Sequence, residues 1–321
     1  MDRSVSGDSS VSGAAASWPE LPLAAWRDTY ATLHLWTQIV GKIRLSQAPW
    51  RNHSWHTTLY LTPRGLTTSL IPYREGTFQI DFDFLDHHLR IRASDGGAAD
   101  IPLRPQAVAE FHDELFGALA RLGIEVKIHG MPNEIENPIP FRRDRVHASY
   151  DPEYANRLLQ VLIQTERVFT RFQCRFVGKC SPVHFFWGSF DLAVTRFSGR
   201  RAPEHPGGIP HLPDWVVREA YSHELSSAGF WPGGGPHPFP LFYSYAYPEP
   251  HGFSAAAIRP EGAFYSAEMR EFVLPYDVVR VSPSPDEALL AFLDSTYAAA
   301  ADLGGWDRTA LERERQSRPG P

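Results

Sequence analysis

Cysteine, methionine and lysine are scarce in this chain of 321 residues, which contains two cysteines and three methionines. Cys174 and Cys180 are the two cysteines, so neither a network of disulfides nor a four-cysteine zinc site can form. So low a cysteine content fits a reducing compartment, and we expect a cytoplasmic protein.

Long hydrophobic runs and an excess of positive charge are also absent. No run of about 18 apolar residues is available to span a bilayer, and the first residues lack the apolar stretch of a signal peptide. The net charge of -6 and the pI near 6.2 give no positive surface that would attract a phosphate backbone. We therefore expect neither a membrane nor a nucleic acid as a partner, and the oligomeric state stays open.

The common catalytic signatures are missing as well. The sequence contains no Gly-x-Gly-x-x-Gly after a strand, no Gly-x-Ser-x-Gly and no His-Glu-x-x-His. Gly178-Lys179-Cys180 has Gln173 where a phosphate-binding loop requires its first glycine. Nucleotide-binding folds and standard hydrolases are disfavoured, and no cofactor can be assigned.

The residues that are present support a large folded core. Hydrophobic residues make up 43% of the chain and aromatic residues 13%, which is enough apolar surface to offset the entropy lost on folding. The length suits two domains or one large one.

Periodicity predicts helices and strands in alternating blocks. Apolar residues three and four apart predict helices over 24–45, 106–122, 152–176 and 288–303. Asp151 with Pro152 should start the third helix, and Ser284 with Glu287 should form a capping box at the last. Alternation predicts strands at 55–61, 66–73, 78–84, 89–93, 124–128, 183–197 (one bent strand or a pair), 241–247, 263–265 and 272–274.

These blocks predict an α+β fold of two related halves, each with a mainly antiparallel sheet packed by amphipathic helices. We expect a disordered tail at 1–17, a first half at 18–145, a second half at 146–306 and a charged tail at 307–321. The repeated order of helix, strands and helix suggests an internal duplication. The second half is longer mainly because of an insertion at 198–238, rich in proline, glycine and histidine.

Several strings resemble an uncharacterised bacterial family, a domain of unknown function, over nearly the whole chain after residue 18. They are HLWTQIVGKIRL, TTLYLTPRGLTTSLIPY, FQIDFDFLDHHLRIRASDGG, HASYDPEYANR, GKCSPVHFFWGSFDLAVTRFSGR, YSHE and GFWPGGG. The resemblance implies no activity, so function must be argued from the residues.

The insertion and its flanks hold the strongest candidates for a site, because long loops on a rigid scaffold often carry functional groups. His223 and Glu224 could act as catalytic base and orienting group, although adjacent residues on a helix do not face the same way. The alternative is that His223 packs and Glu224 is solvated or caps a neighbour.

Asp191 is the third catalytic candidate, since it lies in an apolar strand. A buried carboxylate needs a cation, backbone hydrogen bonds or a proton, and Arg196 or a histidine could supply the charge. A core ion pair is the structural alternative. The candidate ligand-binding residues around it are His184, Trp187, Ser189, Arg196, Tyr221 and Trp231.

Two further groupings remain possible. Ser189, His223 and Asp191 would form a nucleophile, base and orienting group if they met. His184, His223, Glu224 and one of His205, His211 or His237 could hold a metal, whose presence is unknown.

Two clusters in the first half favour a structural role. The segment 50–56 could stack a planar ligand but is better explained as a loop packed on the first helix. Asp81 and Asp83 face Arg90 and Arg92, which indicates a ladder of opposite charges on a sheet surface.

Three functions therefore stay open. The first is a small-molecule binding module whose pocket lies between the second sheet and the insertion. The second is an enzyme that uses the same pocket for metal-assisted or acid-base hydrolytic chemistry. The third is a structural or interaction protein, which would have no deep pocket.

Overall fold

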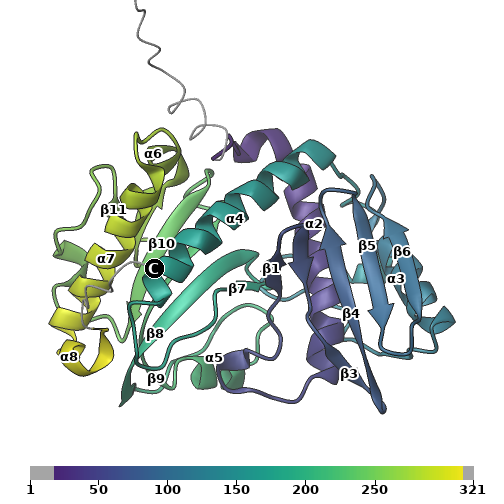
Figure 1. The fold of residues 1–321 in the computed structure, drawn as a ribbon, viewed down its shortest axis with the longest axis horizontal. Helices are drawn as coiled ribbons and strands as arrows, with labels where there is room; N and C mark the ends of the chain where they lie inside the picture. Colours follow the sequence, from purple (N-terminus) through teal and green to yellow (C-terminus); the bar gives the residue numbers. More distant parts are fainter. Residues whose placement is uncertain (1–17, 314–321) are drawn as a thin grey trace, which may run out of the picture.

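The computed structural model describes residues 18–313 as two six-stranded antiparallel sheets with helices packed around them. This is the α+β architecture that the sequence predicts. In Figure 1 the first sheet lies on the right and the second on the left, and helix α4 runs from one towards the other. The predicted tail at 1–17 and the end of the other tail, 314–321, lie outside the described residues.

The first sheet is a meander. Its strands are β1 (Tyr60–Thr62), β2 (Gly65–Thr67), β3 (Ile71–Tyr73), β4 (Gly76–Asp83), β5 (His88–Ala93) and β6 (Ala98–Pro102). β2 and β3 pair with successive parts of β4, so they form one row that is broken at 68–70. The unbroken strand predicted at 66–73 is wrong at this point, where Ser69 has a positive φ of 53°.

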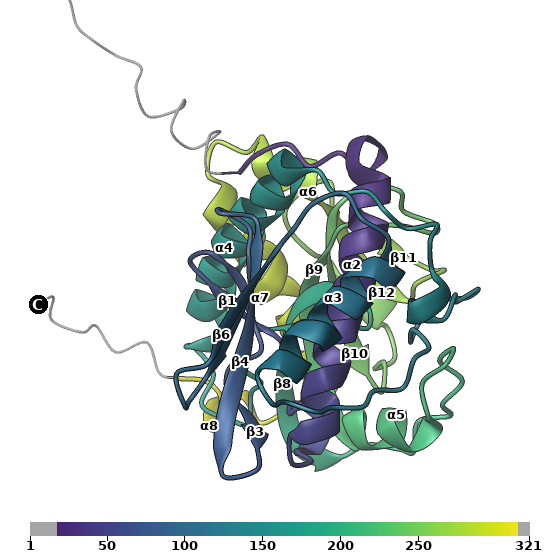
Figure 2. The same cartoon turned by 90° about the vertical axis from the view of Figure 1, so that its right-hand side faces the viewer.

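Two helices cover one face of this sheet (Figure 2). Helix α2 spans Leu23–Gln47 and helix α3 spans Val108–Arg121, close to the predicted bounds. Trp36 of α2 stacks on Phe111 of α3, with ring centroids 4.6 Å apart. This stack joins the two helices above the buried alternate residues of β4.

The charged ladder on this sheet is structural, as the sequence indicates, but its centre is Asp83. The carboxylate of Asp83 is 2% exposed and lies 2.7 Å from Arg64 Nε and 2.9 Å from Arg90 Nε. Burial opposes ionisation, yet the hydrogen bonds from Arg64 and Arg90 hold the pKa of Asp83 well below its usual range. Asp81 instead accepts hydrogen bonds from Gln79.

Residues 122–151 follow α3 and lead to the second half of the chain, and we call them the crossing segment. This segment contains no strand. Residues 124–128, predicted as a strand from alternation, form no strand in the structure. A short 3₁₀ helix, η2 (Phe141–Arg143), is the regular part of this crossing segment. Asp151 then caps helix α4 (Pro152–Gln173) by accepting from the backbone of Glu153 at 2.9 Å, as predicted.

The second sheet has the order β11-β12-β10-β9-β8-β7. Its strands are β7 (His184–Phe186), β8 (Asp191–Arg201), β9 (His223–Trp231), β10 (Leu241–Tyr247), β11 (Phe264–Ser266) and β12 (Glu271–Pro275). The predicted segment 183–197 is thus a strand pair. β9 is a central strand hydrogen-bonded to both β8 and β10, and it lies within the range 198–238 that the sequence suggested as an insertion.

The segment that connects β8 to β9, residues 202–222, leaves the plane of the second sheet. It carries helix α5 (Asp214–Ala220), which packs on the 3₁₀ helix η1 (Asn52–Ser54) of the first half. We call residues 202–222 the covering segment.

Helices α4 and α7 (Pro285–Leu303) pack on one face of the second sheet, and α5 lies on the opposite side (Figures 1 and 2). Helix α6 (Tyr276–Arg280) precedes α7. The predicted capping box at α7 is wrong, because Ser284 makes no side-chain cap, although Pro285 does occupy the first turn.

The stretch 307–313, predicted as part of a tail, includes helix α8 (Arg308–Leu311). Arg308 pairs with Asp302 and Glu312, which attaches this helix to the end of α7. Among residues 18–313, no helix combines the length and the apolar character needed to cross a membrane.

Candidate functional site

A cavity of about 800 Å³ lies on the face of the second sheet that α4 and α7 leave uncovered. The sheet forms its floor, and the covering segment, helix α2, the segment 50–57 and the crossing segment form its walls. The site therefore draws on both halves of the chain.

Strand alternation decides which side chains reach this cavity. Successive residues of a strand point to opposite faces, so the odd-numbered positions of β8, β9 and β10 share one side. The floor residues from these strands are Asp191, Ala193, Thr195, Phe197, Leu225, Ser227, Trp231, Tyr243 and Tyr245. Even-numbered neighbours such as Leu192 and Phe230 are buried under the helices instead.

Tyr243 crosses the floor and meets Asp191. Its hydroxyl donates a hydrogen bond to Oδ2 of Asp191. Gly229 makes this position possible, because a Cβ there would lie 2.3 Å from the Tyr243 ring. The adjacent Tyr245 lies beside Tyr243 with centroids 6.1 Å apart, and its hydroxyl is 3.0 Å from that of Tyr221. A layer of tyrosines thus covers one end of the floor.

Helix α2 contributes a row of polar side chains spaced four residues apart. Tyr30 and His34 line the cavity, and Gln38 and Lys42 continue the row away from it. His34 Nε2 lies 2.7 Å from the carbonyl of Gly188. Burial lowers the pKa of His34 to about 4, so this imidazole is neutral at neutral pH.

The crossing segment inserts Asn133 and Glu134 between α2 and the loop after β7. Gln38 fixes the backbone at Asn133 with bonds of 2.8 and 2.9 Å, and Lys42 donates to the Asn133 side chain. Ser189 donates to Oε2 of Glu134. Gly188 leaves room for this carboxylate, because a Cβ at 188 would lie 2.0 Å from Oε1 of Glu134 and the side chain of Glu134 would have to turn away.

Aromatic residues stand at the other wall. Trp50 lies against Trp215 of the covering segment with centroids 4.8 Å apart, and Trp50 Nε1 donates to Glu219 at 2.7 Å. Both rings line the cavity and remain exposed, by 43% for Trp50 and 56% for Trp215. Their exposure places the mouth of the cavity at this wall.

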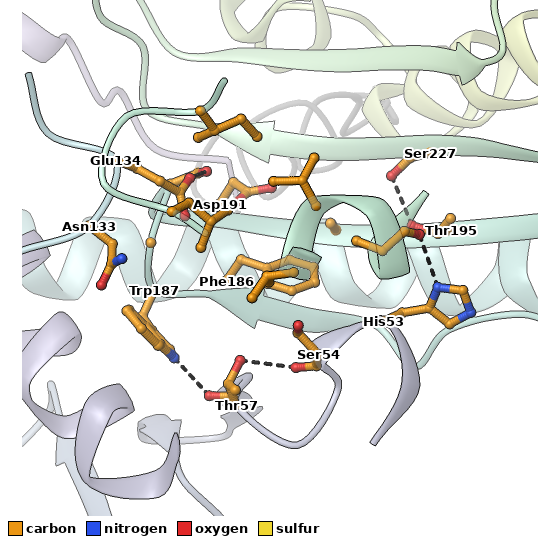
Figure 3. A pocket seen from close by; sticks show the side chains of 18 of the residues that line it. His53, Ser54, Thr57, Asn133, Glu134, Phe186, Trp187, Asp191, Thr195 and Ser227 are labelled. Atoms are coloured by element: carbon orange, nitrogen blue, oxygen red, sulfur yellow. Dashed lines mark hydrogen bonds between the residues drawn. The ribbon is translucent and has the colours of Figure 1, made fainter. Parts of the chain in front are cut away.

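Three carboxyl groups share one part of the cavity: Glu134, Asp191 and Glu271, the last at the start of β12. Figure 3 shows Glu134 beside Asp191. Burial raises the pKa of Asp191 to about 7, and the negative charge of Glu134 adds to the shift. Burial and the charge of Asp191 raise the pKa of Glu271 to about 8. Burial also raises the pKa of Glu134.

Basic groups gather at the opposite end, where Figure 3 shows His53. Lys179 Nζ lies 2.6 Å from His53 Nε2 and 4.9 Å from the Phe197 ring centroid. The other nitrogen of His53 lies 2.9 Å from the carbonyl of Ala220. A hydrogen bond to that carbonyl requires Nδ1 to carry the proton, so Nε2 accepts from the lysine.

Five of the residues predicted from the sequence line this cavity. They are Trp187, Ser189, Asp191, Tyr221 and Trp231. Trp187 is anchored by a 2.8 Å hydrogen bond from its indole nitrogen to the carbonyl of Thr57 (Figure 3). The other four predicted residues do not reach the cavity.

Arg196 and Glu224 lie on the helix side of the sheet, because each is an even-numbered residue of its strand. Arg196 is 2% exposed and stacks on Phe172, 3.4 Å from its centroid, so it is not the partner of Asp191. Glu224 pairs with Arg200 at 2.6 Å, and Arg200 also donates to the carbonyl of Gly304 at the end of α7. Glu224 therefore holds the sheet to α7.

His184 and His223 face the cavity side but lie behind its walls. His184 is fully buried against Phe186, and neither ring nitrogen has a hydrogen-bond partner among the described residues. Burial lowers its pKa to about 3. His223 lies 3.0 Å from Ser222 Oγ and near His53, in the basic cluster.

Neither of the two composite sites assembles. Ser189 bonds to Glu134, Asp191 to Tyr243 and His223 to Ser222. The three side chains considered as nucleophile, orienting group and base are therefore not hydrogen-bonded to one another. Within residues 18–313, no three histidine, cysteine, aspartate or glutamate side chains are placed to hold a metal ion.

Several cavity residues were missed by sequence reasoning. Tyr243, Tyr245 and Glu271 could have been found by extending the alternation of Asp191 across the neighbouring strands. Glu134 gave no such signal, because its position depends on the path of the irregular crossing segment. The residues at 50–56 gave a signal, but they were explained as loop packing.

The geometry defines an α+β protein with one aromatic-walled cavity between its second sheet and the covering segment. The chain belongs to the Family of unknown function (DUF5996), whose model matches residues 18–313. Comparison with curated proteins and with solved structures gives no match. No activity is therefore inherited from a relative, and the cavity itself must carry the argument.

Proposed function

We propose that this protein binds a small organic molecule in the cavity on the second sheet. The observation that carries the proposal is the cavity itself, whose volume of about 800 Å³ lies within the range of sites for drug-sized ligands. A purely structural protein has no need of such a space. The proposal includes a location in the cytoplasm, which the low cysteine content supports, and no role for nucleic acid, which the negative net charge supports.

The lining supports binding for a second reason. Most of its surface is apolar and aromatic, with a small number of polar groups held at fixed positions by hydrogen bonds. Apolar walls supply affinity, and a few oriented polar groups supply specificity. The exposed pair Trp50 and Trp215 provides the entrance.

Filling the cavity should abolish binding. Ala193 is 2% exposed and lines the cavity from the third position of β8, so Ala193→Phe places a ring in the space. Thr309→Phe adds the same ring on the exposed surface of α8 and serves as the control. Thermal shift and titration calorimetry with a panel of neutral, cationic and anionic aromatic compounds give the readout.

We expect compounds that stabilise the wild type and Thr309→Phe but not a folded Ala193→Phe protein. Compounds that bind all three proteins equally, or a panel in which nothing binds the wild type, would contradict the proposal.

Acid-base catalysis on the bound molecule is a second candidate. It is favoured by the carboxyl of Asp191, whose pKa near 7 suits proton transfer at neutral pH. Mass spectrometry of each bound compound after incubation tests it. Conversion by the wild type that is lost in Asp191→Asn supports catalysis, and recovery of every compound unchanged opposes it.

A further inference from the structure

The part of the cavity between helix α2 and strands β8 and β12 contains three acidic side chains from three separate segments. Glu134 comes from the crossing segment, Asp191 from the first residue of β8 and Glu271 from the first residue of β12. The charge of Glu134 raises the pKa of Asp191, and the charge of Asp191 raises the pKa of Glu271. The fold therefore gathers three acidic groups in an apolar space.

No ion pair within residues 18–313 neutralises these three groups. Within residues 18–313, Glu134 is bonded by Ser189, Asp191 by Tyr243 and Glu271 by no side chain, and none of the three makes an ion pair. The ammonium of Lys42 attracts the charge of Glu134 and so opposes the rise in its pKa, but it donates its hydrogen bond to Asn133 and forms no ion pair with Glu134. The buried carboxylate of Asp83 in the first sheet, by contrast, forms ion pairs with Arg64 and Arg90. In that structural role the chain itself supplies the cation.

Buried carboxyls without a cation are costly, and they persist in sites where a ligand completes them. Asp191 is 6% exposed, and its side chain lines the cavity. The missing partner is thus a positive charge that arrives through the cavity.

The surroundings indicate what carries this charge. A bare metal ion is disfavoured, because the acidic groups of residues 18–313 do not converge on a common point. Aromatic rings from Tyr30, Trp231, Tyr243 and Tyr245 line the same cavity. Aromatic faces together with carboxylates are the surroundings that organic ammonium groups prefer.

We propose that the cavity takes an organic amine, whose ammonium group lies among Glu134, Asp191 and Glu271 and whose apolar body lies against the aromatic walls. This inference rests on the proposed function and names the class of ligand. Binding forms ion pairs only, and no covalent bond is made or broken.

The test uses amines paired with alcohols of the same carbon skeleton. Calorimetry compares tryptamine with tryptophol, phenethylamine with phenethyl alcohol and hexylamine with hexanol, at pH 7.5, on the full chain. We expect at least one amine to bind about tenfold or more tightly than its alcohol. Asp191→Asn and Glu271→Gln should each reduce that preference while leaving the affinity of the alcohol unchanged.

Glu268→Gln is the matched control, because it removes one charge from an exposed residue in the turn that leads to Glu271. It should leave the preference for the amine intact. Asparagine at 191 can still accept the Tyr243 hydrogen bond, which limits the disturbance to the fold.

The amine series also has an expected pH dependence. Tryptamine stays protonated from pH 5.5 to pH 8, whereas the carboxyl groups ionise over this range, so its affinity should rise with pH and that of tryptophol should not. The other titratable groups that line the cavity are Tyr30, His34, His53, Tyr221, Tyr243 and Tyr245, and Lys42 lies behind Asn133. Burial keeps His34 and the tyrosines neutral throughout, and burial also lowers the pKa of His53, which lies at the opposite end beside Lys179. Any effect of His53 on binding is shared by the amine and the alcohol, so the comparison between them removes it.

Alcohols that bind as tightly as their amines would overturn the amine class and leave the proposed binding function standing. A preference for amines that survives both carboxyl variants would overturn the assigned position of the ammonium group. Absence of binding by every member of both series, together with no binder in the wider panel, would overturn both proposals.

Discussion

Replacing Asp191 with asparagine is expected to remove much of the pH dependence of stability between pH 5 and pH 7.5. In the folded protein burial raises the pKa of Asp191 to about 7, whereas an unfolded aspartate titrates near ~3.9. Between these two values the folded chain holds a proton that the unfolded chain has lost. Stability therefore falls as the pH rises through this range.

The size of the effect follows from the two pKa values. A carboxyl with these values loses about 2.5 kcal/mol of stabilisation between pH 5 and pH 7.5, because each pKa unit corresponds to about 1.4 kcal/mol. Asparagine cannot ionise, so the variant should gain about this much relative to the wild type as the pH rises. The pKa of Glu271 should also fall once the neighbouring charge is gone.

Urea unfolding followed by tryptophan fluorescence at half-unit pH steps measures this difference. The comparison between variant and wild type removes the contributions of Lys42 and the histidines, which both proteins share. Glu268→Gln, with its exposed carboxyl, should run parallel to the wild type. If the curve for Asp191→Asn also runs parallel, the carboxyl is solvated and the argument for an uncompensated acidic cluster fails.

Two other variants test separate parts of the geometry. Gly188→Ala would place a Cβ 2.0 Å from Oε1 of Glu134, the movable end of a flexible side chain, so we expect the carboxylate to turn away with little change in stability and with weaker amine binding, measured by urea unfolding and calorimetry. An unchanged affinity for the amine would show that the position of Glu134 beside residue 188 does not contribute to binding. His184→Phe removes two buried ring nitrogens that have no partner among the described residues, so the melting temperature should stay equal or rise. A large drop would mean that His184 makes a polar contact that stabilises the fold.

The sequence predicted the strands and helices where a single periodicity persists over many residues. Helix α4 begins where Asp151 and Pro152 predicted, and β10 occupies the predicted bounds of 241–247. The break between β2 and β3 was missed, because a positive φ at Ser69 leaves no mark in the alternation of apolar residues. The capping box at Ser284 was wrong because sequence spacing does not fix the side-chain rotamer.

Only part of the candidate site could be predicted from the sequence, because the face to which a side chain points depends on knowing which segments are strands. Asp191 and Trp187 stood out because a carboxylate and an indole in an apolar strand are conspicuous. Glu224 stood out equally, yet the strand parity that places it under the helices could be read only after β9 was known to be a strand. Treating β9 as part of an insertion removed that information. Arg196 lies five residues after Asp191 in the segment predicted as strand, so alternation alone could have placed it on the opposite face.

The residues from the first half could not be assigned to the site from the sequence. Glu134 and Trp50 reach the cavity through contacts of the crossing segment with α2 and of η1 with α5. Such contacts join residues far apart in the chain, and a single sequence carries no periodic signal for them.

The most direct test of the central claim is a crystal structure of the protein soaked with the amine and alcohol series. The account predicts an organic molecule in the cavity on the second sheet, with an ammonium group next to Asp191 and an apolar body against the aromatic walls. Molecules that bind only elsewhere on the surface, with the cavity holding water alone, would contradict it.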